Sequence, residues 1–135
     1  MCYNFRMMKR TQLYYNRPHI YSSKLPTKMV ADCPDLAKVD IIVESWRRGS
    51  QVPLSCSATY HANDALEIKV GNTSEFKYTK DHSKMARSVD ATRPWVCIGD
   101  INRMTSQYVR GGGTNCISSA FLWKAFNVIK GANTC

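Results

Sequence analysis

The sequence has few acidic residues and no long apolar run, and each shortage excludes a class of protein. Ten Asp and Glu stand against nineteen Lys and Arg, which gives the 135-residue chain a formal charge of +9. No segment stays apolar over the roughly 20 residues that a membrane span requires, so we expect no membrane partner. Residues 1–6 begin no apolar run of signal-peptide length. The positive charge favours a polyanionic partner, with nucleic acid first, because Lys and Arg displace counterions from phosphates.

The sequence also lacks any Cys-x-x-Cys pair, although it has six cysteines, at positions 2, 33, 56, 97, 116 and 135. This spacing argues against a structural zinc site and for disulfides, which form in oxidising compartments. A cysteine content typical of secreted proteins, in a sequence that does not begin with a signal peptide, indicates that an N-terminal part is missing. Asn72-Thr73-Ser74 is a candidate glycosylation sequon.

The length predicts one domain, and the residue patterns predict a mixed α/β fold. We expect strands over Val39–Trp46, Leu66–Val70 and Pro94–Gly99, and a strand over Phe76–Lys80 that runs directly into His82. Leu66, Ile68 and Val70 should form the buried face of their strand, which Gly71 ends. A helix is predicted over Ala120–Lys130, capped by Ser118 and Ser119 and ended by Gly131. Residues 7–15 predict a short helix and residues 22–34 a loop.

His82 and Lys84 are separated by one residue, so in an extended strand their side chains share one face. Cleavage of a phosphodiester needs a nucleophile or base, an acid for the leaving oxygen, and positive charge for the developing anion. Histidine can supply either of the first two, and Lys84 can hold a non-bridging oxygen. Asn102 adds an amide donor, and Gly99 lets the backbone approach a phosphate. We interpret this set as a phosphodiester-cleaving site.

A His-x-Lys pattern by itself is more often a solvated strand edge than a catalytic motif. His19 and His61 lack a Lys two residues further on, and we interpret both as surface histidines. Asp81 points to the opposite strand face and fits a surface or orienting carboxylate. No second His or carboxylate stands at ligand spacing from His82, so we expect neither a metal nor another cofactor.

Five ordered segments between Asp81 and Cys135 resemble the C-terminal end of the deoxyribonuclease II family. They are Asp81-His82-Ser83-Lys84, Pro94-Trp95 with Cys97, Gly99-Asp100 with Asn102-Arg103, Arg110 to Thr114 with Cys116, and Leu122 to Phe126. Weaker similarity reaches upstream through Asn16-Arg17-Pro18, Pro34-Asp35-Leu36 and Val43-Glu44-Ser45-Trp46.

The resemblance implies a phospholipase D-like fold, a β-sheet flanked by helices, in which two His-x-Lys motifs meet across a pseudo-twofold axis. Residues 39–135 would be the C-terminal lobe of one truncated domain, and residues 1–38 a remnant of the region between the motifs. It implies a metal-independent, acid-favoured endonuclease on DNA that leaves 3′-phosphate ends, in a lysosomal or secreted protein.

The resemblance also assigns residues. His82 and Lys84 would carry the second motif, and Asn102 would orient the site. Gly99 and Arg103 are the candidates for substrate contacts. The family's C-terminal disulfides would be Cys97–Cys116 and Cys56–Cys135, whereas Cys2 would lack its family partner and Cys33 has no family counterpart.

The chain departs from the family pattern in several respects. Only one His-x-Lys is present, Met85 stands where the family has tryptophan, and Asp90 lies one residue beyond the place of the superfamily's motif aspartate. Compared with the family, the chain lacks a stretch of residues between Leu36 and the strand that begins at Val39. A monomer would hold half a site, so we expect weak or no cleavage unless a homodimer or the missing N-terminal half completes it.

Two other functions remain open from the sequence. One is an inactive paralogue that binds DNA or another polyanion through its basic surface. The other is a small ribonuclease-like enzyme that uses His82 and Lys84 in acid–base phosphoryl transfer. Gly111 to Gly113 favour a tight turn before Cys116 over a nucleotide-binding loop, and Trp46, Trp95 and Trp123 favour core packing over base stacking.

Overall fold

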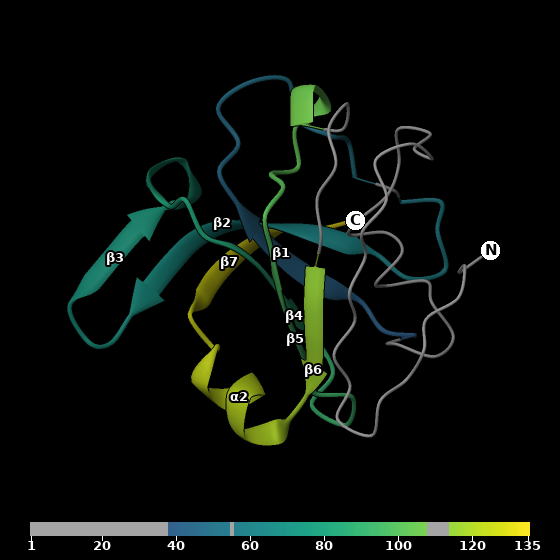
Figure 1. Ribbon diagram of the computed structural model, residues 1–135, viewed down its shortest axis with the longest axis vertical. Coiled ribbons are helices and arrows are strands. Elements are labelled where there is room, and N and C mark those ends of the chain that lie inside the picture. The colour runs from purple at the N-terminus through teal and green to yellow at the C-terminus, as the bar shows by residue number, and fades with distance from the viewer. Residues whose placement is uncertain (1–37, 55, 108–113) are drawn as a thin grey trace.

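The computed structural model describes residues 38–54, 56–107 and 114–135, which form a mixed sheet with few helices (Figure 1). The strands are β1 (Ile41–Ser45), β2 (Ala62–Val70), β3 (Ser74–Lys77), β4 (Lys84–Ser88), β5 (Trp95–Gly99), β6 (Thr114–Ser118) and β7 (Ile129–Asn133). The helices are the 3₁₀ turns η1 (Tyr78–Lys80) and η2 (Thr105–Gln107) and the α-helix α2 (Ala120–Ala125). The class is therefore mixed α/β, as the sequence predicts.

The seven described strands form one sheet in the order β3-β2-β1-β4-β5-β6, and β7 also pairs with β2. β1 is parallel to β2 and antiparallel to β4. Asp64 of β2 pairs with Val43 of β1 and also with Asn133 of β7, so β1 and β7 lie on opposite edges of β2. Ile68 pairs with both β3 and β7. β1 and β3 therefore follow one another along the same edge of β2, and a gap opens between them.

Two apolar clusters cover the two faces of the sheet, because side chains alternate along each strand. One cluster contains Val39, Ile41, Val43, Ala62, Ala86, Cys97 and Cys116. The other contains Ala65, Ile68 and Met85, against which Ile42, Phe76, Phe126, Val128 and Ile129 pack. β1 contributes side chains to both clusters and crosses the middle of the sheet, between β2 and β4 (Figure 1).

The structure confirms the predicted strands at β1, β2 and β5 and the turn at Gly71 but corrects two details. β3 ends at Lys77 and η1 follows, so no strand runs into His82. Ile68 is buried, whereas Leu66 and Val70 are 43% and 51% exposed because β2 changes neighbours along its length. Gly71 adopts a φ of 62°, a left-handed conformation that suits glycine, and the turn lies where it was predicted.

The predicted helix over Ala120–Lys130 is wrong beyond its first turns. Ser119 caps α2 by accepting a hydrogen bond from the Leu122 amide, but the helix ends at Ala125. Ile129 to Asn133 form β7 instead, because they pair along the free edge of β2. The expected apolar face is also only partly buried, since Phe121 is 80% exposed while Phe126 and Ile129 pack in the core.

Both disulfides implied by the resemblance are present. Cys97 and Cys116 stand opposite one another on β5 and β6, and both are buried. Cys56 and Cys135 are both exposed and are joined across a sequence separation of 79 residues. The predictions for residues 7–15 and 22–34, for His19, Cys2 and Cys33, and for Gly111 to Gly113 lie outside the described residues.

The difference in exposure predicts an order of reduction. A mild thiol should open Cys56–Cys135 before Cys97–Cys116, because only the exposed sulfurs meet the reagent. Removing the long-range bridge with Cys56→Ser and Cys135→Ser should cost about 4 kcal/mol of unfolding free energy through the entropy of the unfolded chain. Alkylation with mass spectrometry and urea unfolding measure the two effects. Earlier alkylation of Cys97 would contradict the assignment.

Candidate active site

His82 is brought to the end of β1 by the register of the sheet. Ser45, the last residue of β1, pairs with Lys84, the first residue of β4. The loop that precedes β4 therefore lies beside Trp46, and the ring of His82 stacks on the indole with centroids 4.9 Å apart and planes inclined by 27°. His82 as a residue is exposed to solvent.

Lys84 is close to His82 but is engaged by the backbone. Its Nζ donates a hydrogen bond to the carbonyl oxygen of His82 at 2.7 Å. Asp81 accepts hydrogen bonds from the amide and the hydroxyl of Ser83, at 2.9 and 2.8 Å, and this closes the loop. The positive charge of Lys84 is therefore held next to the His82 backbone at the start of β4.

Asn102, in the loop that follows β5, contacts Trp46, on which His82 stacks. It is 8% exposed, and its Oδ1 accepts a hydrogen bond from the Trp46 amide at 3.2 Å. Its Nδ2 has no hydrogen-bond partner among the described residues. The loop that carries it is tied to residues 50–52, because Val52 donates to the Arg103 carbonyl and Thr105 donates to the Ser50 carbonyl.

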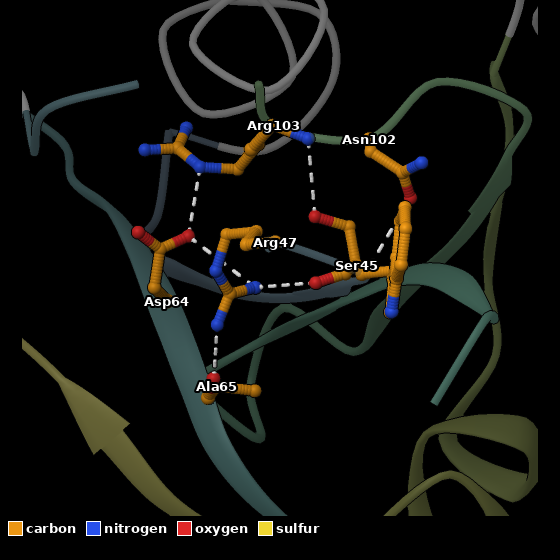
Figure 2. A network of polar contacts seen from close by, with 7 residues as sticks. Ser45, Arg47, Asp64, Ala65, Asn102 and Arg103 are labelled. Atoms are coloured by element: carbon orange, nitrogen blue, oxygen red, sulfur yellow. Dashed lines mark hydrogen bonds and ion pairs between the residues drawn. The ribbon is translucent and has the colours of Figure 1, made fainter. Parts of the chain in front are cut away.

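Arg103, a candidate for substrate contacts, lies in a buried ion pair, and its role at the substrate stays a prediction. It is 4% exposed, and its Nε donates to Asp64 Oδ1 at 2.8 Å (Figure 2). Its amide donates to Ser45 Oγ. These contacts give Arg103 a structural role that joins the Asn102 loop to β1 and β2. Gly99 ends β5 opposite Thr114, and its role at the substrate stays a prediction.

The gap between β1 and β3 is filled by the guanidinium of Arg47. This side chain donates to the carbonyl oxygens of Ser45 and Ala65, and Nη1 lies 3.7 Å from Asp64 Oδ1 (Figure 2). It also packs over the ring of Tyr78, 4.4 Å from the centroid. Asp64 thus balances two buried guanidinium groups, those of Arg47 and Arg103.

Glu44 is the most unusual buried group near the site. It is 0% exposed, and neither carboxylate oxygen has a hydrogen-bond partner within the part of the chain that the structure describes. Burial raises its pKa to about 8; Arg47 opposes the shift, and the carboxylates of Asp81 and Asp64 add to it. Glu44 is therefore protonated in acid and in most molecules at neutral pH.

Sequence reasoning did not identify Glu44, Asp64 or Trp46 as site residues. Trp46 was assigned to core packing, whereas one face of its indole supports His82. Glu44 did carry a signal, because it is a charged residue within a run predicted to be a buried strand. For Asp64 no local pattern distinguishes a buried partner of two arginines from a surface carboxylate.

The remaining residues considered from the sequence, His61 and Asn72, do not belong to the group around His82. His61 is half-buried rather than on the surface, because its Nδ1 lies 3.2 Å from Asp40 Oδ2. Asn72 is exposed in the turn after β2 and is accessible as a sequon. Within the described residues, no three His, Cys, Asp or Glu side chains gather as metal ligands, and no helix is both long and apolar enough to cross a membrane.

Comparison with known proteins shows the family to which the chain belongs. The profile of the family described as Deoxyribonuclease II matches residues 37–135. Deoxyribonuclease-2 of Caenorhabditis elegans is 50% identical over 186 residues, which cover all of this chain and 50% of that protein. The chain belongs to the deoxyribonuclease II family, which confirms the resemblance read from the motifs.

Other relatives are more distant. Plancitoxin-1 of Acanthaster planci is 29% identical over 165 residues, which cover 85% of this chain and 46% of the toxin. Deoxyribonuclease-2-alpha of Sus scrofa is 40% identical over 87 residues, which cover 62% of this chain and 23% of that protein. The chain spans half or less of the length of these relatives.

Proposed function

We propose that the chain contributes one half of an acid deoxyribonuclease site, with His82, Lys84 and Asn102 as its active groups. The observation that carries the proposal is the stack of His82 on Trp46 beside the Asn102 amide, in a chain of the deoxyribonuclease II family. The +9 charge favours DNA as the substrate. The proposal includes a phospholipase D-like arrangement and a lysosomal or secreted location, as the family resemblance implies.

The chemistry follows from the roles that a histidine can take. An imidazole nitrogen forms a bond to phosphorus while the bond to the 5′ oxygen breaks, and an acid protonates that oxygen. Water then hydrolyses the phosphohistidine, which leaves a 3′ phosphate. Lys84 would exchange the His82 carbonyl for a non-bridging oxygen, and Asn102 Nδ2 would donate to the same phosphate.

A single histidine cannot be both the nucleophile and the acid in one step. The second group would come from an N-terminal half or from a second copy of the chain. Acid pH would favour the reaction because the proton donor must start in its charged form. For the chain by itself we therefore expect slow nicking.

The test is plasmid nicking by the oxidised chain at acid pH with a chelator and protein in excess. His82→Ala should lower the nicking rate by about 100-fold or more, because the group that bonds to or protonates the phosphate is lost. His61→Ala is the matched control, since His61 lies on Asp40 away from the site, and it should retain the wild-type rate. Robust cleavage that survives His82→Ala would overturn the proposal.

The alternative is an inactive member that binds DNA only, which the solitary His-x-Lys motif favours. It predicts DNA affinity that falls steeply with salt, because binding releases counterions, and no nicking by wild type or variant.

A further inference from the structure

Trp46 makes three contacts with segments that carry the proposed site. Its ring stacks on His82, its Nε1 donates to the Thr79 carbonyl at 3.1 Å, and its backbone amide donates to Asn102 Oδ1 at 3.2 Å. These contacts join the end of β1 to η1, to the loop before β4 and to the loop after β5. No other described residue contacts the ring of His82 in an aromatic or hydrogen-bonding arrangement.

We propose that Trp46 is a positioning residue that holds the imidazole of His82 in its reactive orientation and aligns it with Asn102. This inference rests on the proposed function, because it names what prepares the same histidine for phosphate.

The exposure of His82 makes such a support necessary. An exposed imidazole rotates freely about its side-chain bonds, and fixing it costs conformational entropy at each turnover. A stacked indole restricts the ring before substrate arrives. The indole face also attracts a cation, so the stack persists when the imidazole carries a proton.

The indole is itself held in place. The bond from Nε1 to the carbonyl oxygen of Thr79 fixes its edge against η1, and Thr79 lies three residues before His82 in the chain. The amide bond to Asn102 Oδ1 leaves Nδ2 as the free donor of that side chain. One residue therefore determines where the nucleophilic or acidic ring and the amide donor lie relative to each other.

Two substitutions separate the aromatic face from the bulk of the side chain. Trp46→Phe keeps a ring under His82 but loses the bond to Thr79, and Trp46→Leu keeps an apolar side chain but removes the face. Trp123→Phe is the matched control, because the ring of Trp123 also stacks on a side chain, with the Arg87 guanidinium carbon 3.5 Å from its ring centroid, but packs α2 against β4. All three are examined in the full oxidised chain.

The first readout is single-turnover nicking at acid pH. Trp46→Leu should lower the limiting rate about tenfold or more while the half-saturating protein concentration changes less than about threefold. Trp46→Phe and Trp123→Phe should stay within about threefold of wild type. A wild-type rate in Trp46→Leu would overturn the inference.

The second readout is the proton NMR spectrum of the His82 ring, which does not depend on catalysis. The indole should shift the ring protons upfield in wild type and in Trp46→Phe, and they should return toward the values of a free histidine in Trp46→Leu. Unchanged shifts in Trp46→Leu would overturn the inference. If the wild-type chain does not nick DNA, the result favours the alternative of a chain that binds DNA only, and the NMR shifts alone decide whether Trp46 positions His82.

Discussion

Asp64→Asn should lower the free energy of unfolding by about 3–5 kcal/mol, because the substitution leaves two buried guanidinium groups without their shared carboxylate. Arg47 and Arg103 are 1% and 4% exposed, so water cannot solvate their charges once Asp64 is neutral. The asparagine has nearly the same shape as the aspartate, so lost packing contributes little. Urea unfolding at neutral pH measures the change.

The matched control is Glu75→Gln, which removes the carboxylate of an exposed ion pair with Lys69. This change should stay within about 1 kcal/mol of wild type, since exposed pairs contribute little. A loss for Asp64→Asn as small as that of Glu75→Gln would show that the two arginines do not depend on Asp64.

Glu44→Gln should stabilise the chain at pH 8 by several kcal/mol, on the order of 4, and leave it nearly unchanged near pH 4.5. The pKa of Glu44 is raised from 4.5 to about 8 in the folded chain, first by burial and then by the carboxylates of Asp81 and Asp64. The folded state therefore binds this proton more tightly than the unfolded state. Its contribution to stability is complete below about pH 4.5 and is lost as the pH rises to about 8.

The measurement is the difference in unfolding free energy between wild type and Glu44→Gln at several pH values from 4.5 to 8. Taking the difference cancels the other titrating groups, which the two proteins share. A difference that is constant over this range would show that Glu44 is ionised in the fold. In the background of Asp64→Asn the pH dependence should be smaller, because the Asp64 carboxylate helps to raise the pKa of Glu44.

The sequence predicts those strands whose residue pattern can be recognised within the strand itself. β1 is a β-branched run, and β5 is a short apolar run after Pro94. The helix prediction failed at its end, because Ile129 and Lys130 belong to β7, whose pairing partner lies more than 60 residues earlier in β2. The apolar residues there fit either a helix or an edge strand. They form a strand because the free edge of β2 is available for pairing.

The candidate site was predicted in part, because His82, Lys84 and Asn102 carry motif signals. Their surroundings depend on register: Ser45 opposite Lys84 is what brings Trp46 under His82. The same sheet geometry buries Glu44 and puts Arg47 into the gap between β1 and β3. Apart from the position of Glu44 within a predicted buried strand, none of these contacts can be predicted from residues that are neighbours in the sequence.

The bonds between residues 50–52 and the Asn102 loop constrain how this protein can vary. Val52 and Thr105 each bridge the two loops through backbone atoms, and Gln51 pairs with Met104. Backbone bonds tolerate a change of side chain but not a change in the number of residues. Substitutions in these loops should therefore be accepted more readily than insertions. One added residue would displace Asn102 from the Trp46 amide to which it is hydrogen-bonded.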